Sequence, residues 1–200
     1  MPPRSGRPPR SATEVEATQS RIADVARKLF RDEGFASVSI RRLAREVGCA
    51  PMTIYGHFAS KTDILRLLWA DILRLAFQEV RLNLNKAQTP DDRLQMAAQT
   101  FVRYWLTNSD HFRLVFMSNG IGRADVATFM TDPGTLEHFL MISDLVRAAS
   151  PTGADIQSRA DTLVAGLIGI ALCLNTIKDY SWSDPYLMIK QLVAAATGPA

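Results

Sequence analysis

The chain has 200 residues, of which 47% are hydrophobic and 22% charged, and its formal net charge is +3. This balance excludes an intrinsically disordered chain and supplies enough apolar side chains for one or two compact domains. The positive charge is uneven, because residues 19–61 carry eight Lys and Arg against four acids, whereas residues 62–200 carry twelve against fourteen. An acidic partner such as a nucleic acid is therefore expected near residues 19–61, with a solvated basic face as the alternative.

The two cysteines, Cys49 and Cys173, are isolated in the sequence and form neither a disulfide framework nor a metal-binding pair. The N-terminal residues lack the apolar core of a signal peptide. The longest apolar run, Leu163–Leu174, is shorter than a bilayer requires. We therefore expect a soluble cytoplasmic protein with no membrane partner, no metal and no other cofactor.

Residues 1–17 are expected to form a disordered arm, since the first twelve contain four Pro, three Arg and no apolar periodicity. The arm is interpreted as a solubilising tail, with contact to nucleic acid as the alternative. A helix beginning at Glu14 or Thr18 is then predicted to run to Glu33 and to end at Gly34.

The segment Ser39–Lys61 has the pattern of two short helices joined by a tight turn. In the first helix Ile40, Leu43, Ala44 and Val47 recur at helical spacing, and Ser39 suits the N-cap position. In the second, Pro51 opens the helix and Ile54 and Phe58 face inward, while the side chains between them point outward. This pattern, over residues 39–58, predicts a helix-turn-helix whose second helix enters the DNA major groove.

The region Thr18–Trp69 resembles the DNA-binding domain of the TetR (tetracycline-repressor-like) family of bacterial transcriptional regulators. The resemblance rests on residue types at fixed spacings, in AxxLFxxxGF at Ala26–Phe35, SIRRLAREVG at Ser39–Gly48 and TIYGHFxSK at Thr53–Lys61. Two residues depart from the family pattern. Ala50 stands where the family usually has a Ser cap, and Gly56 stands where it usually has a larger side chain.

The resemblance implies that Arg41 reaches a base, since Arg can bond guanine O6 and N7 together. Near the start of the second helix, Met52 and Thr53 are candidates for base edges and thymine methyl groups, and Pro51 for an apolar contact. Hydroxyl, imidazole and ammonium groups suit phosphate oxygens, so the expected backbone contacts are Ser39, Tyr55, His57 and Lys61. Two alternatives stay open, namely that Met52 is merely exposed and that His57 only packs.

The rest of the chain is helical in pattern, with no alternating strand pattern and no internal repeat. A long helix is predicted to start after Ser60 and to run to about Asn83, as a strut between two domains at residues 18–64 and 65–200. Further helices are expected at about 90–107, 110–117, 135–149 and 154–180, and from Pro185 onward. The predicted fold is therefore all-α, with an N-terminal three-helix DNA-binding domain and a C-terminal domain for ligand binding and dimerisation.

Large apolar side chains are abundant in the second domain and can line a ligand pocket or fill an ordinary core. The resemblance favours a pocket, because C-terminal domains of the family usually enclose a small molecule whose binding re-spaces the two DNA-binding heads. The expected pocket residues are Phe101, Tyr104, Trp105, Phe112, Phe116, Met117 and Phe139.

The last two predicted helices carry apolar residues on nearly all sides, which is typical of a helix buried all round. In the family the corresponding helices pair with those of a second copy as a four-helix bundle, and the alternative is the core helix of a monomer. The expected dimer-interface residues are Leu163, Leu167, Ile170, Leu174 and Leu192.

No catalytic motif occurs in the sequence: His57, His111 and His138 are scattered, and no phosphate-binding Gly loop or Gly-x-Ser-x-Gly elbow is present. We therefore expect no enzyme, but a dimeric transcriptional regulator that binds a palindromic operator in double-stranded DNA. It is expected to be a repressor released by a small, mostly apolar effector. The alternatives are a ligand-independent DNA-binding protein controlled by a protein partner, or a helical enzyme on the same scaffold.

Overall fold

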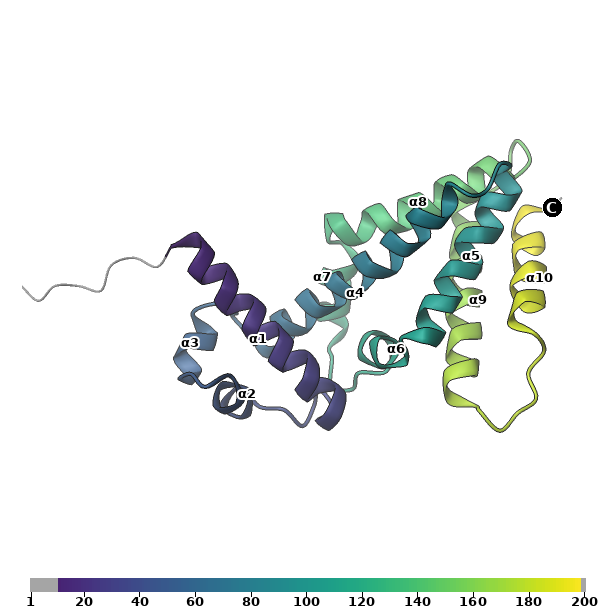
Figure 1. The fold of residues 1–200 in the computed structure, drawn as a ribbon. Helices are drawn as coiled ribbons and strands as arrows, with labels where there is room; N and C mark the ends of the chain where they lie inside the picture. The colour runs from purple at the N-terminus through teal and green to yellow at the C-terminus, as the bar shows by residue number, and fades with distance from the viewer. Residues whose placement is uncertain (1–10, 199–200) are drawn as a thin grey trace, which may run out of the picture. The chain divides into compact units, whose positions relative to one another are not determined.

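The computed structural model describes residues 11–198, which form ten α-helices and no strand (Figure 1), so the predicted all-α class is confirmed. Within these residues the chain divides into two compact units. The first unit ends at Leu68 and also includes Ser118–Ile121, and the second contains Trp69–Met117 and the chain from Gly122 onward. The division falls four residues after the domain boundary predicted at residue 64.

The first unit begins with α1 (Ala12–Glu33), which starts earlier than predicted. The side chain of Ser11 accepts from the Glu14 N–H, and the Glu14 carboxylate accepts from the Ser11 N–H. This reciprocal cap satisfies two backbone donors that would otherwise lack partners and fixes the start of the helix. The expectation of a disordered arm through residue 17 is therefore wrong for residues 12–17, and its first ten residues lie outside the described part of the chain.

The helix-turn-helix consists of α2 (Ile40–Val47) and α3 (Pro51–Tyr55). Ser39 caps α2 by accepting from the Arg42 N–H at 3.1 Å, and Gly48 ends the helix in the left-handed conformation with φ 75°. α3 has no side-chain cap, because Ala50 stands at its N-cap, although Pro51 occupies its first turn. Ile54 and Phe58 are buried and hold this short helix in the unit.

The second unit contains the rest of α4 (Lys61–Leu84), followed by α5 (Pro90–Thr107) and α6 (Ser109–Phe116). The helices α7 (Arg123–Met130), α8 (Pro133–Ala149), α9 (Ile156–Thr176) and α10 (Pro185–Thr197) follow. Helix α7 was not predicted, and α8 begins at Pro133, before the start predicted at about residue 135, with Asp132 as its N-cap. Pro133 fits there because the first turn of a helix requires no N–H from it.

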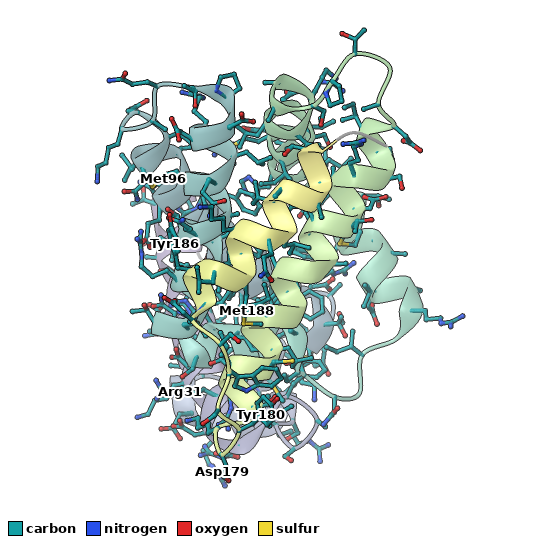
Figure 2. The ribbon with its side chains drawn as sticks, turned by 90° about the vertical axis from the view of Figure 1, so that its right-hand side faces the viewer. Arg31, Met96, Asp179, Tyr180, Tyr186 and Met188 are labelled. Atoms are coloured by element: carbon teal, nitrogen blue, oxygen red, sulfur yellow. The ribbon has the colours of Figure 1, made fainter. Side chains whose placement is uncertain are left out.

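Helix α9 packs against α5, α8 and α10, and Figure 2 shows α10 lying alongside it. Helix α9 approaches α10 closely at Gly166, where an added Cβ would lie 2.5 Å from a Leu192 methyl carbon. Among residues 11–198, α9 is the one helix long and apolar enough to cross a bilayer by length and composition. Its buried residues include Leu163 and Leu167, and 28% of its apolar stretch is buried within the chain.

Candidate functional site

The outward face of α3 is unusually apolar and exposed for a helix of five residues. Met52 is 76% exposed and Tyr55 is 50% exposed, whereas Thr53 is half-buried. Pro51 is also exposed. Because a side chain can read a base edge only if it projects from the surface, these positions satisfy the first geometric requirement for DNA recognition.

The arginines of α2 differ in what they contact. Arg42 bridges Glu33 at 2.9 Å and Glu46 at 2.6 Å, and so ties α2 to the end of α1. Arg41 and Arg45 are exposed and form no salt bridge within residues 11–198. They lie one turn apart on the same side of α2. Arg45 was not among the predicted DNA contacts, although its spacing from Arg41 was a visible signal.

Lys61 has a structural role that the sequence did not reveal. Its ammonium group donates to the carbonyl oxygens of Phe35 at 2.6 Å and Val38 at 2.8 Å, and it lies 4.2 Å from the centroid of the Phe35 ring. Burial lowers the pKa of this amine. The three donors of an ammonium group are thus directed to the loop before α2, and the expected phosphate contact of Lys61 does not fit this geometry.

Two further predicted backbone contacts have mixed surroundings. The Ser39 hydroxyl oxygen accepts the cap hydrogen bond, which leaves its O–H available as a donor. His57 is half-buried, and its Nδ1 is buried without a hydrogen-bond partner in the described part of the chain. Packing at the end of α3 therefore explains His57 better than an outward phosphate contact does.

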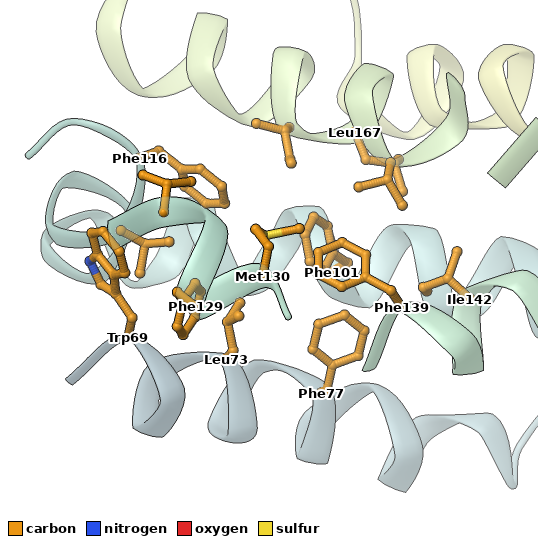
Figure 3. Close-up of a pocket in the computed structure, with 14 residues that line it drawn as sticks. Trp69, Leu73, Phe77, Phe101, Phe116, Phe129, Met130, Phe139, Ile142 and Leu167 are labelled. Carbon is orange, nitrogen blue, oxygen red and sulfur yellow. The ribbon is translucent and has the colours of Figure 1, made fainter. Parts of the chain in front are cut away.

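The second unit contains a cavity of about 170 Å³, shown in Figure 3. Its lining side chains are apolar or aromatic and come from six helices: Trp69, Leu73, Phe77, Phe101, Val115, Phe116, Val126, Phe129, Met130, Phe139, Ile142, Val164, Leu167 and Ile168. The only N–H among these side chains, Trp69 Nε1, donates to the Leu114 carbonyl at 2.8 Å. The cavity therefore suits a ligand without charge.

The predicted pocket residues divide into two groups. Phe101, Phe116 and Phe139 line the cavity. The other four do not line it: Tyr104, Trp105 and Phe112 are buried in the surrounding core, and Met117 is 42% exposed. Trp105 packs edge-on against the rings of its neighbours, including Phe116 at 5.0 Å, so it supports the cavity wall from behind.

The sequence did not indicate the contribution of α4 to this cavity. Trp69, Leu73 and Phe77 lie one turn apart along α4 and form one wall, as Figure 3 shows. Their helical spacing was visible, but α4 was interpreted as a strut between domains.

The predicted dimer-interface residues differ in how far they are buried within one copy of the chain. Leu163 and Leu167 are buried within one copy of the chain, and Leu167 lines the cavity, so neither is available to a second copy. Leu192 packs against Gly166. Ile170 and Leu174 are half-buried. The sequence pattern could not separate these roles, because every face of α9 is apolar.

Comparison with known proteins matches residues 22–68 to the family described as bacterial regulatory proteins, tetR family. The HTH-type transcriptional regulator HbdR of Aromatoleum sp. (strain CIB) is 29% identical over 70% of the chain and 60% of its own length. An HTH-type transcriptional regulator of Staphylococcus aureus (strain USA300) is 37% identical over 26% of the chain and 28% of its own length. The chain thus spans less than two thirds of either relative.

Two solved structures share the fold over most of both chains. The fatty acid degradation regulator FadR from Bacillus halodurans matches with a TM-score of 0.71 and 14% identity, over 90% of this chain and 95% of its own. A tetR-family regulatory protein from Rhodococcus RHA1 matches with a TM-score of 0.64 and 16% identity, over 92% and 98%. All four proteins are named as regulators.

Proposed function

Because the chain belongs to the tetR family of bacterial regulatory proteins, we propose that it binds operator DNA and represses transcription until a small apolar ligand releases it. The observation that carries the DNA-binding part is the exposed surface formed by Met52 and Tyr55 of α3 and by Arg41 of α2. Arg41 and Met52 are the proposed base contacts, and Tyr55 and the Ser39 hydroxyl are the proposed phosphate contacts.

The proposed assembly is a homodimer on a palindromic site, since a domain this small gains specificity by reading two half-sites about 34–36 Å apart. The outward faces of α9 and α10 support this proposal. Leu172 on α9 and Leu187 on α10 are 41% and 52% exposed. Ala165 and Gly169 lie on the same face of α9 as Leu172, because they precede it at helical spacing. An added Cβ at Gly169 would meet no atom within 4 Å. A second helix could therefore approach closely there.

The cavity supports an effector over the alternative of a ligand-independent regulator. Its lining offers no converging polar groups, so the alternative of a helical enzyme gains no support from the cavity residues. An uncharged, mostly hydrocarbon molecule would replace unfilled space with van der Waals contacts and would bury apolar surface on binding.

Two stretches of chain connect the residues that line the cavity to the DNA-binding unit. Helix α4 contributes Lys61–Leu68 to the first unit and Trp69 to the cavity wall. Phe116 and Val126 line the cavity, and in the sequence they precede and follow Ser118–Ile121, a segment that belongs to the first unit. A ligand can change DNA affinity only by binding one arrangement of these segments better than another.

The decisive experiment is capture of fragmented genomic DNA by the purified chain, followed by footprinting of the recovered fragments. The proposal expects saturable binding to a few sites with two-fold symmetry. A panel of uncharged aromatic and aliphatic compounds is then tested for thermal stabilisation of the protein and for release of the footprinted site. Binding that shows no sequence preference would refute the DNA part, and a panel without either effect would refute the effector part.

A further inference from the structure

Gly56, directly after α3, has no structural reason to be glycine. Its backbone is right-handed, with φ −71° and ψ −14°, a conformation that every residue adopts readily. An added Cβ would lie 3.4 Å from the Thr53 carbonyl oxygen and 3.5 Å from that of Met52, which are ordinary contact distances. Neither backbone strain nor packing within the chain therefore excludes a side chain at this position.

Glycine also lowers the stability of this turn, because it loses more conformational freedom on folding than any other residue. Helix α3 is short and has no side-chain cap, so its last turn would benefit from a better helix former. The absence of a side chain at residue 56 works against the local structure.

The position of Gly56 suggests what compensates for this loss. It follows Met52 by four residues and so lies on the same side of the helix, next to Tyr55. Met52 and Tyr55 are the exposed large hydrophobic side chains of the helix-turn-helix. Because residue 56 has no side chain, the backbone there is exposed beside Met52 and Tyr55 in the surface assigned to DNA, and this position is called the notch.

We propose that Gly56 is a specificity-determining residue that admits the DNA duplex close to the backbone at the end of α3. This inference rests on the proposed function, since it assumes that α3 enters the major groove. Glycine is the residue that permits close approach of a backbone to a partner. The notch fixes how deeply α3 enters the groove and therefore which base edges Met52 reaches.

The test compares Gly56→Ala and Gly56→Leu with the unaltered protein on its footprinted operator and on random-sequence DNA. Gly56→Ala is expected to weaken operator binding by at least about tenfold, because an added side chain would displace the contacts that α3 makes with bases in the groove. Gly56→Leu is expected to weaken it further, because its side chain is larger. Random-sequence binding should change less, because it depends on phosphates. The midpoint of thermal unfolding should stay the same or rise for Gly56→Ala.

The matched control is Gly134→Ala, a glycine in the first turn of α8, where an added Cβ would lie 3.2 Å from the Asp132 carboxylate that caps this helix, so that only a small shift of that carboxylate is required. This variant should bind the operator as the unaltered protein does. If the unaltered protein has no operator, the proposed function itself fails. If it has one and Gly56→Ala binds it equally or more tightly, the notch proposal is overturned. A lower unfolding midpoint for Gly56→Ala would also overturn it, because Gly56 would then be needed for folding.

Discussion

The two units of the chain use their interior and their surface in opposite ways. In the helix-turn-helix unit the interior is filled by side chains such as Ile22, Leu43 and Ile54, all fully buried, and the candidate functional groups lie outside. In the second unit the candidate site is a space inside the core, lined by rings from several helices. In the first unit the groups that recognise a partner are therefore expected among exposed cations and hydroxyls. In the second unit they are expected among the apolar side chains that line the internal cavity.

The largest expected effect concerns the polar anchoring of the first unit. Lys61→Met removes an ammonium group that donates to the carbonyls of Phe35 and Val38, so the loop before α2 loses its anchor. We expect a loss of about 3 kcal/mol in the free energy of unfolding, since charged hydrogen bonds are the stronger kind. Chemical denaturation measures it, with Lys86→Met as control, because the Lys86 amine donates to the Asn83 side chain in a solvent-exposed hydrogen bond. Unchanged stability together with lost DNA binding would make Lys61 a phosphate contact after all.

Next in size is the effect of Arg41→Ala on the outer surface of the same unit. The variant should lose about 2 kcal/mol of operator affinity, because a bidentate arginine–guanine contact contributes that order of discrimination. Its affinity for random-sequence DNA should fall much less. Titration of both DNAs by fluorescence anisotropy measures the difference, and equal losses on both would contradict a base contact.

A smaller effect is expected when the space in the second unit is filled. Leu73→Phe adds a ring to the cavity wall and should change the free energy of unfolding by only about 1 kcal/mol, because the added atoms enter existing space. DNA binding without ligand should persist, whereas release by a ligand should be abolished. Isothermal titration with a compound found in the panel measures this, and a full response in the variant would place the ligand elsewhere.

The smallest effect is a pH dependence of the second unit. His138 is buried and stacks on Phe77 at 4.5 Å, and burial, together with the charge of Arg81, lowers its pKa below the ordinary 6.5, although Glu137 opposes this. The unfolded chain then binds the proton more readily, so stability should fall as the pH drops through 6.5 and level off below the folded pKa. Denaturation at several pH values measures the slope, which should be absent in His138→Phe.

Helix limits were predictable where the chain marks them with caps. Thr89-Pro90 and Asp184-Pro185 combine a side-chain acceptor with a proline suited to the first turn, and both predicted helix starts are observed. The start of α1 was missed because the composition of the preceding residues outweighed the single Ser11–Glu14 capping pair.

The cavity was only partly predictable, because sequence spacing gives the face of a helix but not the distance to its neighbours. Phe101 and Trp105 lie one turn apart on α5 and look equivalent in sequence. In the structure Phe101 lines the cavity, whereas Trp105 is enclosed by other aromatic rings. Which of two neighbouring rings borders empty space depends on helices far away in the chain, such as α4 and α9.

Arg42 is paired with two carboxylates, and Lys61 donates to main-chain carbonyls, so neither cation is free to neutralise a phosphate. This affects how DNA binding depends on the salt concentration. A duplex would release fewer condensed counterions than the formal charge of residues 19–61 suggests. Each neutralised phosphate makes the slope of log affinity against log salt concentration more negative by about 0.9. A salt titration would therefore count how many cations this domain actually presents to DNA.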